Sequence, residues 1–310
     1  MDVSLIIPVK DEKESLPFLV ERLFAVMRAT GKSFECLIVD DGSIDGSAAV
    51  AASLKKDYPE IRVIVLRRNF GQTAAMSAGI DQARGSVLVT LDADLQNDPD
   101  DIPMMLEKIA QGHDLVCGWR KDRRDPFLRR LFSDVANRLI SRVTKIRLHD
   151  SGCTLRAYRS EVIKPVRLYG EMHRFIPALI SVSGVNMAEV PVRHHPRLRG
   201  RSKYGFSRTL RVILDLITVK FFLSYHSSPS YIFGRVRLMS CFGGMLFFIA
   251  ALLMKFFEAR TLTGNPFFYL FIFLETTGMQ LIMIGLLGEV NIRTYYESQQ
   301  KSVYVIKDIL

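Results

Sequence analysis

The chain has 310 residues, which allows one large domain with an appendage or two modest domains. It averages 48% hydrophobic and 24% charged residues, and its formal net charge is +10. Its four cysteines show neither CxxC pairing nor metal-ligand spacing, which excludes a disulfide framework and indicates reduced thiols in a cytosolic compartment. The first residues lack the basic segment and long apolar core of a signal peptide, so we expect the soluble half to stay in the cytoplasm.

Residues 1 to about 205 alternate short apolar runs with helical patterns. The runs predict strands at residues 3–9, 35–39, 61–66, 86–91 and 114–118, and the patterns predict helices at residues 16–28, 47–56, 73–84 and 103–111. This alternation predicts an α/β domain with a mainly parallel, doubly wound sheet. In such sheets ligands bind beyond the carboxyl ends of the strands.

Acidic residues follow three of these predicted strands. Asp11 and Glu12 follow the first strand, the pair Asp40–Asp41 follows the second, and Asp92 and Asp94 follow the fourth. Two carboxylates two residues apart, with Gln96 beyond them, form a set of oxygen ligands for a hard divalent cation. Mg²⁺ or Mn²⁺ bound there would neutralise a nucleotide diphosphate leaving group. The alternative is a solvated turn.

The segment Asp40–Ser43 combines two carboxylates with a glycine that permits a tight turn. A carboxylate there is suited to accept a hydrogen bond from a base N–H or a ribose hydroxyl. The alternative is a helix N-cap, although Ser43 or Asp45 could fill that role. The chain contains no GxxxxGK and no GxGxxG, which excludes a P-loop and a dinucleotide-binding fingerprint.

The chain beyond about residue 205 has the pattern of a membrane anchor. Residues 207–225 form an amphipathic pattern, which predicts a helix in the membrane interface or, alternatively, a surface helix packed on its own domain. Two further segments, at about residues 236–257 and 266–288, are each long and apolar enough to cross a bilayer. The flanking arginines predict that both termini face the cytoplasm, with residues 258–265 on the other side.

Basic residues are concentrated near residues 120–147 and 193–211. Because membrane segments follow, this pattern favours phosphates and lipid headgroups as partners over nucleic acid.

Glu275 lies in the middle of the second span and is expected to face protein, which favours a homo-oligomer. Residues 302–309 have a β-like pattern and are expected to pair with a neighbour or with their own domain. His194 and His195 are adjacent in a strand-like segment, so they point to opposite faces and do not form a metal-ligand pair.

Taken together, these motifs carry a family resemblance. The residues are Ile7–Pro8–Val9 with Asp11–Glu12, Val39–Asp40–Asp41–Gly42–Ser43, Asn69 with Gly71, Leu91–Asp92–Ala93–Asp94–Leu95–Gln96, Asp150–Ser151–Gly152–Cys153, Arg156–Ala157–Tyr158–Arg159, and Gly200 with Ser202–Lys203–Tyr204. The chain resembles glycosyltransferase family 2, and within it the polyisoprenyl-phosphate glycosyltransferases, which include dolichol-phosphate mannose synthases. The two-helix tail is most similar to the bacterial enzymes that make undecaprenyl-phosphate glucose.

The resemblance implies a glycosyltransferase A-type fold and a role for each matching residue. The donor nucleotide would be held by Pro8, Asp11, Glu12, Asp40, Asp41 and Asp92, and its diphosphate by Arg201, Ser202 and Lys203. The metal would be held by Asp94 and Gln96 with Asp92, and the acceptor phosphate by Arg120, Arg129 and Ser133. Asp150 would act as a general base or orient the acceptor, and the alternative is a structural role in a turn.

The resemblance also implies the reaction, an inverting transfer of glucose from UDP-glucose to undecaprenyl phosphate at the inner membrane, for cell-envelope or O-antigen glycosylation. The alternatives are a GDP-mannose or modified aminoarabinose donor, or a non-catalytic membrane scaffold. The implied organisation is a catalytic domain at residues 1–205, a juxtamembrane segment at 206–230, two transmembrane helices within 231–290 and a cytoplasmic tail at 291–310.

Overall fold

The computed structural model describes residues 1–121, 148–150, 152–170, 172–181, 184–196 and 302–310, together with isolated helical residues between 269 and 298. The chain divides into two compact units, one of Met1–Val219 with Ser302–Leu310 and the other of Lys220–Lys301. The strands and the candidate site described below belong to the first unit.

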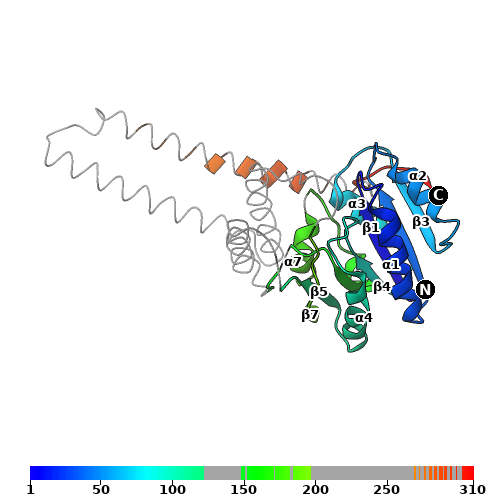
Figure 1. Cartoon of the computed structure of the whole chain (residues 1–310). Helices are drawn as coiled ribbons and strands as arrows, with labels where there is room; N and C mark the ends of the chain where they lie inside the picture. The colour runs from blue at the N-terminus through cyan, green and yellow to red at the C-terminus, as the bar shows by residue number, and fades with distance from the viewer. Residues whose placement is uncertain are drawn as a thin grey trace, which may run out of the picture. The chain divides into compact units, whose positions relative to one another are not determined.

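The described residues of this unit form one eight-stranded sheet in the order β7-β5-β6-β4-β1-β2-β3-β8. Strands β1, β3, β4, β5 and β7 are labelled in Figure 1. The strands are β1 (Val3–Val9), β2 (Phe34–Asp40), β3 (Ile61–Leu66), β4 (Val87–Thr90), β5 (Leu115–Trp119), β6 (Arg156–Arg159), β7 (Met187–Pro191) and β8 (Ile306–Ile309). The centre of the sheet is parallel, because β1 pairs with both β2 and β4, and β2 pairs with β3. The predicted α/β sheet is therefore confirmed. Two strands pair in the antiparallel direction: β6, which was not predicted, and β8, which lies in the segment 302–309 with the β-like pattern.

The four helices predicted from the sequence lie close to the first four observed helices, and the last two described helices were not predicted. They are α1 (Leu16–Ala29), α2 (Ser47–Leu54), α3 (Gln72–Gln82), α4 (Ile102–Ala110), α6 (Ser160–Ile163) and α7 (Ile176–Ser181), with 3-10 turns η1 (Pro99–Asp101) and η2 (Met172–Phe175). Helix α1 buries Leu16, Leu19, Leu23 and Met27, whose spacing of three or four residues places them on one face. This face packs into the core beside β1 and β2.

The central strands β1 and β2 are almost entirely buried, which explains their continuous apolar sequences. A strand covered on both faces needs apolar side chains at every position, not only at alternate ones. Cys36, Cys117 and Cys153 are buried in this core as free thiols, as expected, and burial raises their pKa.

Pro8 lies near the end of β1, where the pairing with β4 has already finished. Ile6 is the last β1 residue in register with β4, and its carbonyl accepts a hydrogen bond from Leu91 N. Because alternate residues face the same neighbour, the nitrogen of Pro8 also faces the β4 side, beyond the ladder. The missing N–H therefore costs no sheet hydrogen bond. Past this point β1 and β4 separate, and their loops are free to form a site.

The C-terminal residues return to the sheet as β8, antiparallel to β3. Val63 N donates to Leu310 O over 3.0 Å, Leu310 N donates to Val63 O over 2.8 Å, and the Tyr304 hydroxyl donates to Asp81 Oδ2 over 2.8 Å. We expected residues 302–309 to pair with a neighbour or with their own domain. The structure shows that they pair with their own domain.

Among the described residues, no helix is long and apolar enough to span a membrane. The predicted juxtamembrane segment at 206–230 lies outside the described residues, and so does nearly all of the two predicted spans.

Candidate active site

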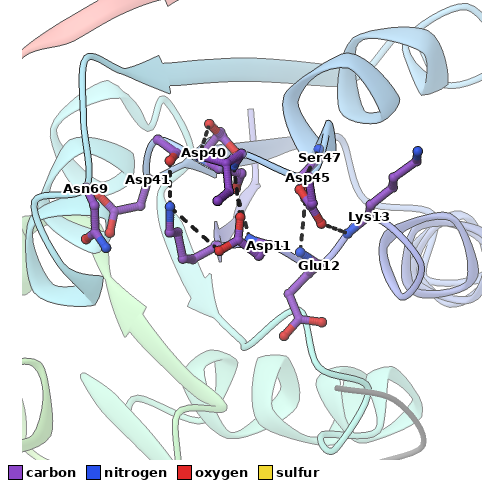
Figure 2. Close-up of polar contacts among 12 residues, drawn as sticks. Asp11, Glu12, Lys13, Asp40, Asp41, Asp45, Ser47 and Asn69 are labelled. Carbon is purple, nitrogen blue, oxygen red and sulfur yellow. Dashed lines mark hydrogen bonds and ion pairs between the residues drawn. The ribbon is translucent and has the colours of Figure 1, made fainter. Parts of the chain in front are cut away.

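The loops that follow β1 and β2 are hydrogen-bonded to each other (Figure 2). Asp11 N donates to Ser43 Oγ over 2.9 Å, and Ile44 N donates to Asp11 Oδ1 over the same distance. Further along, Glu12 N donates to Ser47 Oγ over 3.0 Å. The first two acidic motifs predicted from the sequence therefore form one structure at the carboxyl edge of the sheet.

Backbone geometry in this region requires particular residues. Gly42 has a φ of 64°, and a Cβ atom there would lie 2.6 Å from the carbonyl carbon of Arg68. No side chain fits at that distance, so the glycine lets the β2 and β3 loops approach each other. Asp11 has a φ of 54°, which is uncommon for a residue with a side chain and is compensated by its two hydrogen bonds to the β2 loop.

Asp40 leaves one carboxylate oxygen for a ligand. Its side chain is buried, and its Oδ2 accepts a hydrogen bond from Ser43 N over 3.1 Å. Its Oδ1 is buried and has no hydrogen-bond donor among the described residues. A buried acceptor left without a partner costs about 1–3 kcal/mol. A base N–H or a ribose hydroxyl placed here would remove that cost, as the predicted donor-binding role requires.

Asp41 braces the loop that follows β3. Its two oxygens accept hydrogen bonds from Phe70 N over 2.7 Å and from Gly71 N over 2.9 Å. Burial raises the pKa of Asp41, although these two hydrogen bonds act to lower it. The structure therefore places Asp41 as a support of the site, with both oxygens already used. The N-cap of α2 is Gly46, which makes no side-chain cap hydrogen bond, so the alternative N-cap role is filled by none of the acidic residues or Ser43, although Asp45 Oδ1 accepts a hydrogen bond from Ser47 N over 2.9 Å.

The metal loop, which we define as residues 92–97, follows β4. Gln72 Nε2 donates to Asp92 Oδ1 over 2.8 Å, and Gln96 N donates to Asp94 Oδ1 over 3.2 Å. Burial and the neighbouring charge of Asp94 raise the pKa of Asp92 to about 6. The turn also contains Leu95 at a φ of 60°.

These residues fit a divalent cation. Two neighbouring carboxylates attract a positive charge, since the charge of Asp94 acts to raise the pKa of Asp92, and oxygen ligands suit Mg²⁺ and Mn²⁺. The described residues contain no group of three or more His, Cys, Asp or Glu side chains arranged for a metal. A cation held by one or two carboxylates, substrate phosphates and water does not need such a group.

Arg120 and Asp150 form a close ion pair where β5 ends. Arg120 Nε donates to Asp150 Oδ2 over 2.6 Å and Arg120 Nη2 donates to Oδ1 over 2.9 Å, so the contact is bidentate. The backbone N–H groups of Arg120 and Gly152 also donate to this carboxylate. The sequence pattern placed both residues near the acceptor, and the structure joins them. With both oxygens of Asp150 accepting hydrogen bonds, its geometry suits the orientation of Arg120 better than proton abstraction.

Several polar residues near the site were not identified from the sequence. Gln72 contacts Asp92, and His149 stacks on Trp119 with a centroid distance of 4.4 Å while its Nδ1 lies 2.8 Å from Glu189 Oε2. None of these contacts has a short sequence separation, so no local pattern could have found them. The predicted site residues Arg129, Ser133, Arg201, Ser202 and Lys203 lie outside the described residues.

A model of the family described as glycosyl transferase family 2 matches residues 4–167, which include the three acidic loops and the Arg120–Asp150 pair. The chain belongs to glycosyltransferase family 2. It is therefore a transferase enzyme, and the predicted family is confirmed.

Two curated relatives in this family match along the whole chain. A dodecaprenyl-phosphate galacturonate synthase from Rhizobium johnstonii is 42% identical over 314 residues, covering 100% of this chain and 93% of the relative. An undecaprenyl-phosphate 4-deoxy-4-formamido-L-arabinose transferase from Pseudomonas paraeruginosa is 37% identical, covering 99% of this chain and 90% of the relative. These family 2 relatives differ in their sugar and share a polyprenyl phosphate.

A solved structure of glucosyl-3-phosphoglycerate synthase from Mycobacterium tuberculosis, in complex with Mn²⁺, UDP and phosphoglyceric acid, has the same fold. Its TM-score is 0.54 at 15% sequence identity, covering 72% of this chain and 78% of that one. This likeness shows that the family 2 sheet described above is of the glycosyltransferase A type.

Proposed function

We propose that this enzyme transfers a sugar from a nucleotide diphosphate donor to a polyisoprenyl phosphate, with inversion at the anomeric carbon. The observation that carries the proposal is the site at the carboxyl edge of the sheet, where the open oxygen of Asp40 and the carboxylates of Asp92 and Asp94 follow β2 and β4, the two strands on either side of β1. The acceptor class comes from the two relatives, both of which are named for a polyprenyl phosphate.

The donor side is assigned as follows. Asp40 would accept a hydrogen bond from the nucleoside, with Pro8, Asp11 and Glu12 forming the wall of the β1 loop, and Asp41 would hold the β3 loop in place. Asp94, Gln96 and Asp92 would hold Mg²⁺ or Mn²⁺, which neutralises charge on the leaving diphosphate. The Mn²⁺ and UDP bound by the structurally similar synthase support this assignment. Arg201, Ser202 and Lys203 would contact the diphosphate.

The acceptor side is assigned to Arg120, Arg129 and Ser133. A phosphate monoester has a second pKa of about 6, so its oxygen is already largely ionised at neutral pH. A strong general base is therefore not needed. Asp150 would hold the Arg120 guanidinium in the orientation that meets the acceptor phosphate, because a bidentate contact fixes the plane of the group.

The donor sugar is the finer part of the proposal. The resemblance in the sequence favoured glucose from UDP-glucose, with mannose or a modified aminoarabinose as alternatives. The relatives add galacturonate and support a formamido-arabinose. We place galacturonate first, because the relative that carries it is 42% identical along the whole chain.

We also propose an inner-membrane location with the catalytic unit and both termini in the cytoplasm, and a homo-oligomeric assembly. The pairing of β8 with β3 supports this topology. Residues 302–310 and residues 1–196 must lie on the same side of a membrane to share one sheet, so the chain between them crosses an even number of times. The two apolar segments at 236–257 and 266–288 meet this condition.

The test is transfer by the purified full chain onto undecaprenyl phosphate in detergent. The donors are UDP-galacturonate, UDP-glucose, UDP-4-deoxy-4-formamido-L-arabinose and GDP-mannose, each with Mg²⁺, with Mn²⁺ or with a chelator. One donor should give a lipid-linked sugar, and the chelator should abolish it. Transfer to a soluble sugar phosphate but not to the lipid would refute the assignment of a polyisoprenyl phosphate acceptor. Full activity in the presence of the chelator would refute the requirement for a divalent metal.

A further inference from the structure

A segment that follows β7 runs alongside the metal loop. Asn97 and His194 form an antiparallel bridge, and His195 N donates to Gln96 O over 2.9 Å. The two segments are almost 100 residues apart in sequence. Gln96, assigned above as a metal ligand, is thus fixed through its backbone by a part of the chain outside the loop.

Asp98 joins these two segments by its side chain, of which only 1% is exposed. His195 Nε2 lies 2.9 Å from Asp98 Oδ2, and because an ionised carboxylate only accepts, this nitrogen is the donor. Arg22 Nη2 of α1 lies 2.8 Å from Asp98 Oδ1, and Arg193 Nε lies 3.4 Å from Oδ2. Burial acts to raise the pKa of Asp98, but these partners outweigh it and hold the pKa below its usual value.

Arg193 adds a second attachment beside the first. Its backbone N–H donates to Asp101 Oδ2 over 2.7 Å, and its Nε lies 3.1 Å from Asp101 Oδ1. The segment 193–195 is therefore held by side chains of Asp98 and Asp101, which lie directly after the metal loop. Four polar contacts over three residues fix its register along the loop.

The metal loop needs such support because its turn is strained. Leu95 has a φ of 60°, a backbone conformation that a residue with a side chain keeps only where its surroundings impose it. On the other flank Asn97 Nδ2 donates to Thr154 Oγ1 over 3.0 Å. The loop is thus held by Thr154 on one side and by His194 and His195 on the other.

We propose that Asp98 and His195 are positioning residues for the metal loop, which hold Gln96 and Asp94 in the geometry that binds a divalent cation with the donor diphosphate. This inference rests on the function proposed above. Neither residue is assigned a contact with the cation or with the substrate, since both act through the backbone of Gln96 and Asn97. Outer-shell partners of this kind typically change metal affinity by about tenfold to a hundredfold when they are removed.

The direct test is hydrogen–deuterium exchange of the full chain in detergent, without metal or donor. His195→Ala should raise the exchange rate of amides in residues 92–98 by roughly tenfold, because the loop loses a hydrogen bond to a charged group. His195→Gln offers an amide N–H near the position of Nε2 and should restore much of the protection. Unchanged exchange in His195→Ala would overturn the proposal, and so would an equal rise in the β1 peptide, which would indicate general destabilisation.

The second measurement is the affinity for Mn²⁺ in the presence of UDP, followed by electron paramagnetic resonance. His195→Ala and Asp98→Asn should bind Mn²⁺ about tenfold more weakly or worse, and His195→Gln should lie closer to the wild type. Arg22→Ala is the matched control, since it removes a partner of the same carboxylate from α1 and should leave Mn²⁺ affinity within about twofold. Wild-type affinity in His195→Ala would overturn the positioning role. If the wild-type chain itself bound no Mn²⁺ with UDP, the proposed function would fail, while the exchange experiment would still decide whether the contacts hold the loop.

Discussion

The contact between Arg120 and Asp150 gives a sharp test of how the acceptor side works. Among the described residues, the Asp150 carboxylate accepts two hydrogen bonds from the Arg120 guanidinium and two from backbone N–H groups, and its side chain is 3% exposed. Asp150→Asn keeps the shape but turns one oxygen into an NH₂ group that faces other donors. A hydrogen bond to a charged group contributes about 1.5–3 kcal/mol, so kcat/KM for undecaprenyl phosphate should fall roughly tenfold to a hundredfold.

The two possible roles of Asp150 differ in what else changes. If it orients Arg120, the loss should appear mainly in the KM for the lipid, and the pH dependence of kcat should keep its shape. If it is a general base, kcat itself should collapse and the limb of the pH profile that reports the base should disappear. Initial rates between pH 6 and 9, at saturating and at limiting lipid, separate these outcomes.

A double-mutant cycle completes the test. Because Asp150 is argued to act through Arg120, the pair Arg120→Ala with Asp150→Ala should be no more defective than Arg120→Ala alone. Losses that multiply would refute the positioning role and show that the carboxylate works independently. Thermal unfolding, followed by the fluorescence of the single tryptophan, checks that each variant is folded before its kinetics are interpreted.

Three further predictions concern the metal, the topology and the stability. Asp94→Asn should fold with an unchanged melting temperature yet lose most transfer activity, and near-normal turnover in saturating metal would remove Asp94 from the ligand set. A cysteine placed at Thr263 should react with a membrane-impermeant reagent added to intact cells and one at Ser302 should not, and the reverse pattern would overturn the orientation. Burial lowers the pKa of His173 to about 3, so below about pH 6.5 the unfolded chain gains a proton that the folded chain does not, and the free energy of unfolding should fall by about 1.4 kcal/mol per pH unit. His173→Gln should flatten this dependence between pH 7 and pH 5, as measured by thermal unfolding, and an equally steep decline would assign it to other groups.

The parallel half of the sheet could be predicted because each strand carries its own local signal. The predicted strand at 61–66 matches β3, and the predicted helix at 16–28 differs from α1 by one residue. Apolar runs of strand length bounded by polar turns are sufficient for such assignments. The strands β6 and β8 gave weaker signals because they are only four residues long and contain charged residues. Their place in the sheet depends on partners far away in the sequence.

The candidate site divides in the same way. The acidic motifs at the three strand ends could be located, because parallel topology places consecutive carboxyl ends at one edge. The different roles of these acidic residues could not be predicted from the sequence. Asp40 and Asp41 are adjacent and chemically identical, and only the structure distinguishes them, since the Asp41 oxygens meet two backbone N–H groups while one Asp40 oxygen meets none. Likewise, the sequence predicted only that His195 does not form a metal-ligand pair with His194, and it gave no sign of the contact with Asp98, 97 residues earlier.

The C-terminal strand has a consequence beyond the fold of the sheet. Without β8, strand β3 would present its free N–H and C=O groups as an exposed edge, which is a site of unwanted pairing. Strand β8, which covers this edge, follows an intervening segment of more than 100 residues. Its pairing with β3 closes that segment into a loop. Closing a loop of that length carries an entropic cost that grows only slowly with length, so a long excursion is compatible with the pairing. What the pairing does not tolerate is an odd number of membrane crossings within the excursion. The short sequence at residues 306–309 therefore constrains the arrangement of the two proposed membrane segments more strongly than its own weak strand pattern suggests.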